Sequence, residues 1–258
     1  MKKRLSFLTL LLTLVGLSFS SCDSVSEPQR FKPAQIDPQR AILIEEFTGQ
    51  NCTNCPDGHA AIKELTGALG DSVVPVSIHA SSLAMDPPRG YKTATGEEYY
   101  KNIGSPALPA AVINRQTSPL QVPVWGSTIN SLIMTPTPFT VKASAEVSSD
   151  GANYDISVAF SSKQDYEGSL SVWIIENDLV GRQLDHGVNI PDYVHNHVFR
   201  AAANGTWGEK VSLKANVPQH TSYSVPIESG WKMANVYVVA FLYDDSGVAQ
   251  VTSTQSHH

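Results

Sequence analysis

The pattern of hydrophobic residues changes near residue 135. Before that point, short apolar runs alternate with segments whose apolar or small residues recur at helical spacing. The run Ala41–Phe47 precedes such a segment, which ends near Leu69, and a second apolar run covers Ser72–Ala80. This order predicts a strand, a helix and a second strand in one βαβ unit. Pro75 predicts an edge or irregular position for the second strand, because proline has no N–H to donate.

Further elements complete this first segment. Residues Thr95–Ile103 are a short helical candidate, Ala110–Asn114 is a short apolar strand, and Val124–Met134 could supply a closing helix. Helices alternating with buried strands are typical of an α/β fold. We therefore expect an α/β domain over residues 41–135.

After Thr135-Pro136-Thr137-Pro138 the apolar residues alternate or run at strand length. Gly, Asn, Asp and Ser lie between many of the runs. Such spacing predicts an all-β antiparallel sandwich, immunoglobulin-like in kind, over residues 138–256. The expected strands are Phe139–Val147, Tyr154–Phe160, Ser169–Glu176, His197–Ala202, Glu209–Ala215, Tyr223–Ile227, Val236–Tyr243 and Val248–Thr252.

The N-terminus has the features of an export signal. Met1–Arg4 is positively charged, and the apolar run Leu5–Leu17 is too short to span a bilayer. Small residues then precede Cys22, which resembles a bacterial lipobox and implies a signal peptide over residues 1–21 with lipid attached to Cys22. The alternative is ordinary cleavage that leaves a free thiol. Residues 22–40 are rich in proline and polar residues and read as a tether.

Charge and composition narrow the possible partners. The chain of 258 residues is 41% hydrophobic and carries a formal net charge of -6. No basic tract follows the first residues, so we expect no nucleic-acid binding.

The candidate chemistry is a C-x-x-C pair, Cys52 and Cys55, between the first strand and the first helix. Unpaired N–H groups and the dipole at a helix N-terminus favour a thiolate, which is the nucleophile in disulfide exchange. Pro56 fits this position, because proline is tolerated in the first turn of a helix. We expect Cys52, nearer the surface, to attack and Cys55 to resolve. A structural disulfide is the alternative.

In these features, residues 41 to about 134 resemble the thioredoxin superfamily. Glu46-Phe47 stands six residues before Cys52, where thioredoxins carry a buried acid followed by phenylalanine. The resemblance implies that Glu46 accepts the proton of Cys55. It also implies that Pro109, or otherwise Pro106, is a cis-proline whose loop faces the cysteines and pairs with an extended substrate.

The motif departs from the thioredoxin pattern in three ways. No tryptophan precedes Cys52, the central dipeptide is Thr53-Asn54 rather than Gly-Pro, and Pro56 stands where a basic residue is common.

The mature chain is also similar to a Bacteroidetes outer-membrane lipoprotein family, the twenty-eight-kilodalton outer-membrane protein group. The similarity rests on the lipobox, on EEFTGQNCTNCPDGHA (residues 45–60) and on DYVHNHVFRAAANGTWGE (residues 192–209). It implies a lipid-anchored protein of the outer membrane that faces either the periplasm or the exterior. It implies no particular activity.

Metal binding is a further alternative. The two cysteines with His59 and His79 could ligate zinc or copper, but no second C-x-x-C supports such a site. His195-Asn196-His197 could place two imidazoles on one face of a strand, near Asp185 or Asp192. Because no further ligand spacing supports this, we expect these histidines and His186 to lie hydrogen-bonded in a long polar loop, and we expect no metal or cofactor.

The tryptophans are dispersed along the sequence. This favours packing roles over a ligand platform. They are Trp125, Trp173, Trp207 and Trp231.

Two functions from different classes follow. In the first, the protein is an exported, lipid-anchored thiol–disulfide oxidoreductase whose partners are protein thiols or disulfides. In the second, it is a surface lipoprotein that binds or adheres to a partner, and Cys52–Cys55 is a structural disulfide.

Overall fold

A computed structural model describes residues 39–255. The predicted signal peptide, Cys22 and residues 22–38 of the predicted tether lie outside the described residues. Within the described part, no helix is long and apolar enough to cross a bilayer.

The first segment contains the predicted βαβ unit. Strands β1 (Ile42–Thr48) and β2 (Val73–His79) pair in parallel and are joined by helix α2 (Cys55–Leu69). Strand β3 (Ala110–Ile113) pairs antiparallel with the other edge of β1. The strand and helix order expected from the sequence is confirmed within two residues at each end.

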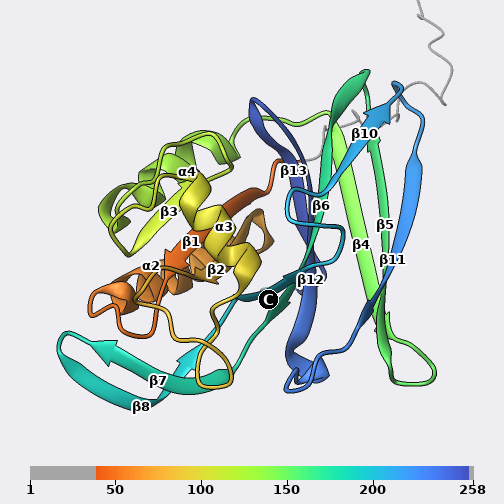
Figure 1. Ribbon diagram of the computed structural model, residues 1–258. Helices are drawn as coiled ribbons and strands as arrows, with labels where there is room; N and C mark the ends of the chain where they lie inside the picture. The colour runs from red at the N-terminus through yellow and green to blue at the C-terminus, as the bar shows by residue number, and fades with distance from the viewer. Residues whose placement is uncertain (1–38, 256–258) are drawn as a thin grey trace, which may run out of the picture. The chain divides into compact units, whose positions relative to one another are not determined.

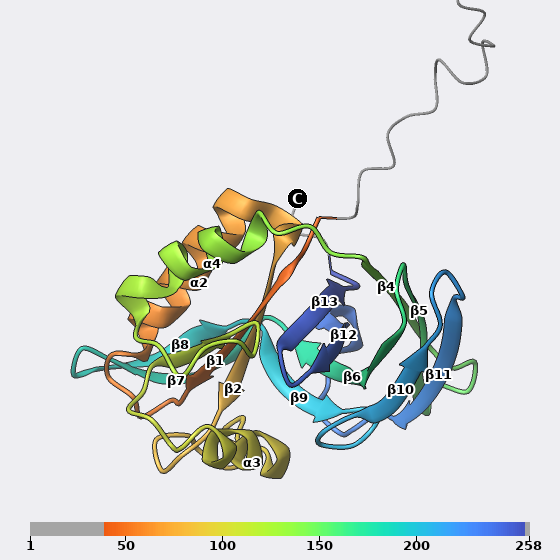
Figure 2. The ribbon, with the colours of Figure 1, turned by 90° about the horizontal axis from the view of Figure 1, so that it is seen from above.

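Helices cover both faces of these three strands (Figure 2). Helices α2 and α4 (Trp125–Ile133) lie on one face, where their apolar side chains pack on Ile42 and Ile44 of β1. Helix α3 (Ala94–Asn102) lies on the other face and begins at Thr93, whose hydroxyl accepts a hydrogen bond from the Gly96 N–H. Short 3₁₀ turns cover Gly70–Ser72, Val122–Val124 and Met233–Asn235.

The second segment is built of antiparallel strands in two layers (Figure 1). One layer is a three-stranded sheet in the order β11–β5–β4. The other contains β13, β12, β6, β9 and β10. The bounds are β4 (Phe139–Val147), β5 (Asn153–Ser162), β6 (Tyr166–Glu176), β9 (Val198–Ala202), β10 (Glu209–Leu213), β11 (Gln219–Pro226), β12 (Val236–Asp244) and β13 (Gly247–Ser253).

Strands β6 and β12 are buried on both faces. Val172 and Val238 face the three-stranded sheet, whereas Trp173 and Val239 face the core shared with β1, β2 and α3. Burial on two faces explains why these strands read as continuous apolar runs rather than alternating ones. The fold is therefore mixed α/β and mostly β.

One sheet joins the two segments. Strand β9 pairs in parallel with β2 at Ser77 and Val198, and the Ser77 N–H donates to the His197 carbonyl at 2.7 Å. The eight strands of the larger sheet within residues 39–255 thus come from both sides of the boundary expected near residues 136–138. The residues at which this boundary was expected form the link between α4 and β4. Pro75 lies in regular register opposite Ile44 of β1, and on its other side β2 pairs with β9 only at Ser77. Pro75 therefore lies at a locally unpaired edge, the first of the two predicted alternatives, and its position is not irregular.

The expected polar loop near residue 186 is instead a β-hairpin, and this expectation was wrong. Strands β7 (Leu179–Asp185) and β8 (Val188–His195) pair antiparallel through a turn in which His186 and Gly187 both have positive φ. Such two-residue turns suit the twist of a hairpin. The hairpin lies beside α2 in Figures 1 and 2. Apolar and polar residues do not alternate regularly along β7 and β8, so the hairpin could not be predicted from the sequence.

Candidate functional site

Cys52 and Cys55 form a disulfide at the N-terminus of α2. Both residues are buried, with 3% of Cys52 and none of Cys55 exposed. The expectation that Cys52 lies nearer the surface therefore holds only marginally. As the structure stands, an incoming thiol has little access to either sulfur.

The β7–β8 hairpin covers the cysteine loop through hydrogen bonds. The side-chain amide of Gln183, which is fully buried, donates to the carbonyls of Cys52 at 3.0 Å and Gly49 at 3.3 Å. Two backbone hydrogen bonds add to the attachment. The Leu184 N–H donates to the Gln50 carbonyl at 2.8 Å, and the His186 N–H donates to the Thr53 carbonyl at 2.9 Å. Access to the disulfide thus depends on this hairpin.

Glu46 is fully buried on the α2 side of β1. Its Oε2 accepts a hydrogen bond from the Ser77 hydroxyl at 2.6 Å, whereas its Oε1 makes no hydrogen bond to the described residues. Burial raises the pKa of Glu46 to about 8, although the Ser77 bond opposes this shift. At neutral pH the carboxyl is therefore mostly protonated.

Gly58 brings the carboxyl, the helix and the cis-proline together. A Cβ on Gly58 would lie 2.7 Å from Glu46 Oε1 and 3.3 Å from Pro109 Cβ, so only glycine fits without a shift. Gly58 is three residues after Cys55 and lies on the same face of α2. Glu46 and Pro109 therefore meet α2 one turn beyond Cys55.

The Leu108–Pro109 peptide bond is cis, which confirms Pro109 rather than Pro106 as the cis-proline. The Pro87–Pro88 bond is also cis, which was not predicted from the sequence.

Three histidines from distant parts of the chain form a cluster under the hairpin. We call His59, His79 and His195 the histidine cluster; their ring centroids lie 5.4 Å apart for His79 and His195 and 6.2 Å apart for His59 and His195. Tyr193 of β8 packs on both His59 and His195, and its hydroxyl lies 2.8 Å from His59 Nδ1.

All three histidines of the cluster are neutral at physiological pH. Burial lowers the pKa of His59 to about 4 and that of His195 to about 3, and it holds the pKa of His79 well below its usual range. His59 Nε2 lies 3.6 Å from Glu46 Oε1 and 3.0 Å from the Thr48 hydroxyl. Because His59 is neutral and Glu46 is protonated, the contact between His59 Nε2 and Glu46 Oε1 is not an ion pair.

The geometry does not support the metal sites that the sequence left open as alternatives. Within residues 39–255, no group of three or more His, Cys, Asp or Glu side chains is arranged to hold a metal ion. His195 is buried in the cluster, whereas His197 Nδ1 lies 2.9 Å from the Tyr237 hydroxyl. The two imidazoles do not share a face, because His197 has positive φ and lies between β8 and β9, where strand alternation is broken.

A cavity of about 460 Å³ separates α2 from the end of β8. His59, Ser77 and Tyr193 line it, together with Lys63 and Val194. Ser77 contacts Glu46 Oε2 and His59 lies near Oε1, so both side chains link the buried carboxyl to the cavity. Polar side chains, rather than the apolar core, therefore separate Glu46 from the cavity.

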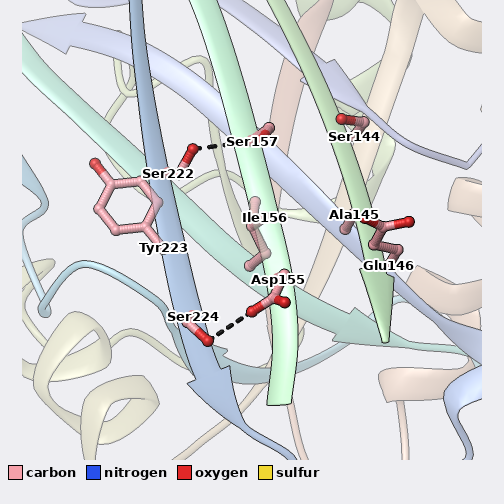
Figure 3. Close-up of a pocket in the computed structure, with 9 residues that line it drawn as sticks. All are labelled: Ser144, Ala145, Glu146, Asp155, Ile156, Ser157, Ser222, Tyr223 and Ser224. Carbon is pink, nitrogen blue, oxygen red and sulfur yellow. Dashed lines mark hydrogen bonds between the residues drawn. The ribbon is translucent and has the colours of Figure 1, made fainter. Parts of the chain in front are cut away.

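A second hollow lies on the outer face of the three-stranded sheet (Figure 3). Its volume is about 420 Å³, and small polar side chains of β4, β5 and β11 line it. Ser224 donates to Asp155 at 2.6 Å, and the hydroxyls of Ser157 and Ser222 lie 3.4 Å apart. None of the site residues predicted from the sequence lies in this hollow.

Comparison with known proteins identifies the family. The model of the family described as outer membrane protein Omp28 matches residues 96–257, which is more than half of the chain. The chain belongs to the Omp28 family. It is an outer membrane protein, as the sequence predicted. The matched range begins after the cysteine motif, and no curated protein matches the chain.

Solved structures show a similar fold. HBP35 of Porphyromonas gingivalis has 13% identity and a TM-score of 0.66 over 83% of this chain and 74% of that chain. Protein AGR_C_4864 from Agrobacterium tumefaciens has 15% identity and a TM-score of 0.52 over 84% and 95%. At these identities the likeness concerns the fold alone. A domain of the outer membrane lipoprotein Omp28 from P. gingivalis has 23% identity but a TM-score of only 0.31, over 45% and 86%.

Several residues of the site were not predicted from the sequence. Gln183 and Tyr193 come from the hairpin that was expected to be a loop, and Ser77 is an ordinary strand residue. His59 was considered only as a metal ligand. His59 stands four residues after Cys55, so the two side chains lie on the same face of α2. This spacing was the one local feature of the sequence that could have placed His59 near the cysteines.

We predict that Glu46 alone lowers the free energy of unfolding by about 2 kcal/mol between pH 6.5 and pH 8. Its folded pKa of about 8 exceeds the ordinary value of 4.5, so the folded state holds a proton that the unfolded state releases. The Glu46 contribution is therefore greatest at low pH and is lost as the pH rises toward 8. The buried histidines act in the opposite direction, because near pH 6.5 they are partly protonated only in the unfolded state, so the Glu46 contribution is obtained by comparison with a Glu46 variant.

Urea unfolding at a series of pH values checks this prediction. Relative to wild type, the free energy of unfolding of Glu46→Gln should rise by about 2 kcal/mol between pH 6.5 and pH 8. Glu64→Gln, on the exposed face of α2, should keep a constant difference from wild type. An equal slope in wild type and Glu46→Gln would show that another group titrates.

We also predict that Gln183→Ala accelerates reduction of the disulfide by a soluble phosphine about tenfold or more. The change leaves the carbonyls of Cys52 and Gly49 without the Gln183 donor, at a free-energy cost of about 1–3 kcal/mol at the hairpin. The control is Val238→Ala, in the core of the sandwich. If Val238→Ala accelerates reduction equally at matched stability, global unfolding rather than hairpin opening exposes the disulfide.

Proposed function

We propose that this outer membrane protein performs thiol–disulfide exchange through Cys52 and Cys55, and that the β7–β8 hairpin controls access to them. The observation that carries this proposal is the buried carboxyl of Glu46 beneath the first turns of α2. A purely structural disulfide requires no ionisable group at that position. Burying a carboxyl with one oxygen unpaired is unfavourable, so its retention is better explained by a role in proton transfer.

The exchange would proceed in two steps once the hairpin moves aside. In the dithiol form, the Cys52 thiolate attacks one sulfur of a client disulfide, forms a mixed disulfide and releases the other client sulfur as a thiolate. Water admitted by the open hairpin lowers the pKa of Glu46 toward its ordinary range, so that its carboxyl ionises. Cys55 then gives its proton to the Glu46 carboxylate and attacks the Cys52 sulfur of the mixed disulfide, which releases the second client thiolate. The client disulfide is reduced and Cys52–Cys55 is oxidised. The reverse sequence oxidises a client dithiol.

Two further parts of the proposal concern the rest of the chain. Residues 41–135 form a thioredoxin-like unit, for which the parallel β1–β2 pair, the cysteines at the start of α2 and the cis Pro109 are the supporting features. An export signal over residues 1–21 and lipid on Cys22 attach the protein to the outer membrane. The clients are protein thiols or disulfides, and extended backbone near Pro109 is the docking position.

A second candidate function rests on a different observation, the burial of both cysteines under the hairpin. In this alternative the disulfide is structural and the protein binds a partner at the outer membrane. The polar hollow of Figure 3 is then a place for such a partner. This alternative expects partner binding to survive when both cysteines are replaced by serine.

Cysteine variants test the proposal, all in a Cys22→Ser background so that the third thiol does not interfere. We predict that Cys55→Ser accumulates a mixed disulfide with a model protein disulfide, because Cys52 attacks and no resolving thiol remains. Cys52→Ser should lose exchange by about tenfold or more. Mass spectrometry of the trapped adduct and the rate of client reduction are the measurements.

The matched control is the protein with Cys22→Ser alone, which should keep full exchange. Exchange that is unchanged in Cys52→Ser would refute the proposal. Exchange absent from every form, with a folded protein, would favour the binding module.

A further inference from the structure

An aromatic pocket lies on the face of β1 opposite Glu46. Glu45 and Phe47 point to this face, because successive side chains of a strand alternate. The pocket has a volume of about 260 Å³ and contains none of the residues used for thiol exchange. Its lining residues are Glu45, Phe47, Tyr99, Asn102, Ile103, Val112, Arg115, Thr117, Trp207, Tyr243 and Asp244.

Arg115 forms the floor of the aromatic pocket. Its guanidinium carbon lies 4.4 Å from the ring centroid of Tyr243 and 4.9 Å from that of Phe241. Its Nη2 donates to Glu45 Oε1 at 3.1 Å, and its Nε lies 3.3 Å from both Glu45 oxygens. Nη1 donates to no group within residues 39–255, so one end of the guanidinium stays available.

The backbone that presents Arg115 is strained. Asn114 and Arg115 are consecutive non-glycine residues with φ of +54° and +53°. Side chains other than glycine rarely adopt this left-handed conformation, because the Cβ comes close to the following carbonyl oxygen. The turn is held in place, since the Asn114 amide donates to the Val248 carbonyl at 2.9 Å and the Val248 N–H donates to the Asn114 carbonyl at 2.8 Å. Strain fixed by specific bonds is typical of binding sites.

The wall of the aromatic pocket is an exposed indole. Trp207 is 41% exposed, yet its orientation is set by a hydrogen bond from Nε1 to Glu98 at 2.9 Å and by an edge contact with the Tyr99 ring at 5.2 Å. An exposed tryptophan held in this way offers a flat apolar surface that needs no ordering on binding.

Polar groups around the indole can both donate and accept hydrogen bonds. The amide of Asn102 makes no hydrogen bond to the described residues. The Thr117 hydroxyl accepts from the Ile113 N–H and keeps its own hydrogen to donate. Asp244 uses only Oδ1, toward Ser246, which leaves Oδ2 to accept. These groups suit a ligand that carries several hydroxyls.

The charges of the aromatic pocket disfavour an ionic ligand. Glu45 neutralises Arg115, and the guanidinium already occupies the aromatic faces that a second cation would need. Asp244 in the lining and Glu98 at Trp207 repel an anion. The volume lies below that of pockets for drug-sized molecules and suits one ring.

We propose that the aromatic pocket binds a single neutral sugar ring, either a free monosaccharide or a terminal residue of a glycan. The ring stacks on Trp207, its hydroxyls bond to Asn102, Thr117 and Asp244, and Arg115 Nη1 donates to a ring or hydroxyl oxygen. This site is independent of the proposed thiol exchange and does not use the cysteines.

Saturation-transfer NMR on the full chain tests this site with glucose, galactose, mannose and N-acetylglucosamine as separate probes. We expect at least one of them to bind, and Trp207→Ala to weaken that binding about tenfold. Trp207→Phe keeps an aromatic face and should weaken it about threefold or less. Asn102→Ala changes an exposed side chain without a bond in the described part, so it should not unfold the protein while it weakens binding about threefold.

The same titrations with tetramethylammonium, benzoate and indole test other ligand classes. Binding of one of these that depends on Trp207, without binding of any sugar, would overturn the assignment to a sugar. Sugar binding that is unchanged in a folded Trp207→Ala variant would place the sugar elsewhere and overturn the site. Absence of binding by all four sugars at tens of millimolar would overturn the proposal, because the dissociation constants would then lie above this concentration.

Discussion

The attachment of the β7–β8 hairpin to the cysteine loop is the contact on which the proposed thiol–disulfide exchange depends. A buried glutamine, Gln183, donates to the carbonyls of Gly49 and Cys52, and backbone bonds from Leu184 and His186 extend the attachment. Each bond contributes only about 1 kcal/mol net. A few such bonds separate a buried disulfide from an accessible one, so local opening of the hairpin needs far less free energy than global unfolding.

The polar groups beneath the hairpin make this region unlike an ordinary core. Glu46, His59, His79 and His195 are all buried or nearly so, and each favours its neutral form. Opening of the hairpin would admit water and move these pKa values back toward their ordinary ranges. Access to the disulfide and the proton affinity of Glu46 are therefore coupled through one movement. The aromatic pocket lies on the other face of β1, and none of its lining residues belongs to this coupled group.

The sequence predicted those parts of the site that follow from local spacing. The strand, the cysteines and the helix are contiguous, so Glu46, Cys52 and Cys55 could be placed before any tertiary contact was known, and Pro109 could be singled out from the strand that follows it. The cover over the site could not be predicted, because it is made by residues more than 120 positions later. The histidine cluster and the aromatic pocket also unite distant segments. Trp207 was expected to pack, yet it is exposed at a pocket formed by five separate stretches of chain.

The reduction potential of the Cys52–Cys55 couple tests the central claim most directly. It is measured by equilibration of the Cys22→Ser protein with glutathione buffers, followed by quantification of the two thiols. Thiol–disulfide exchange predicts a potential between about -270 and -120 mV, the range of catalytic dithiols. A potential below about -300 mV would mark a structural disulfide and contradict the exchange function.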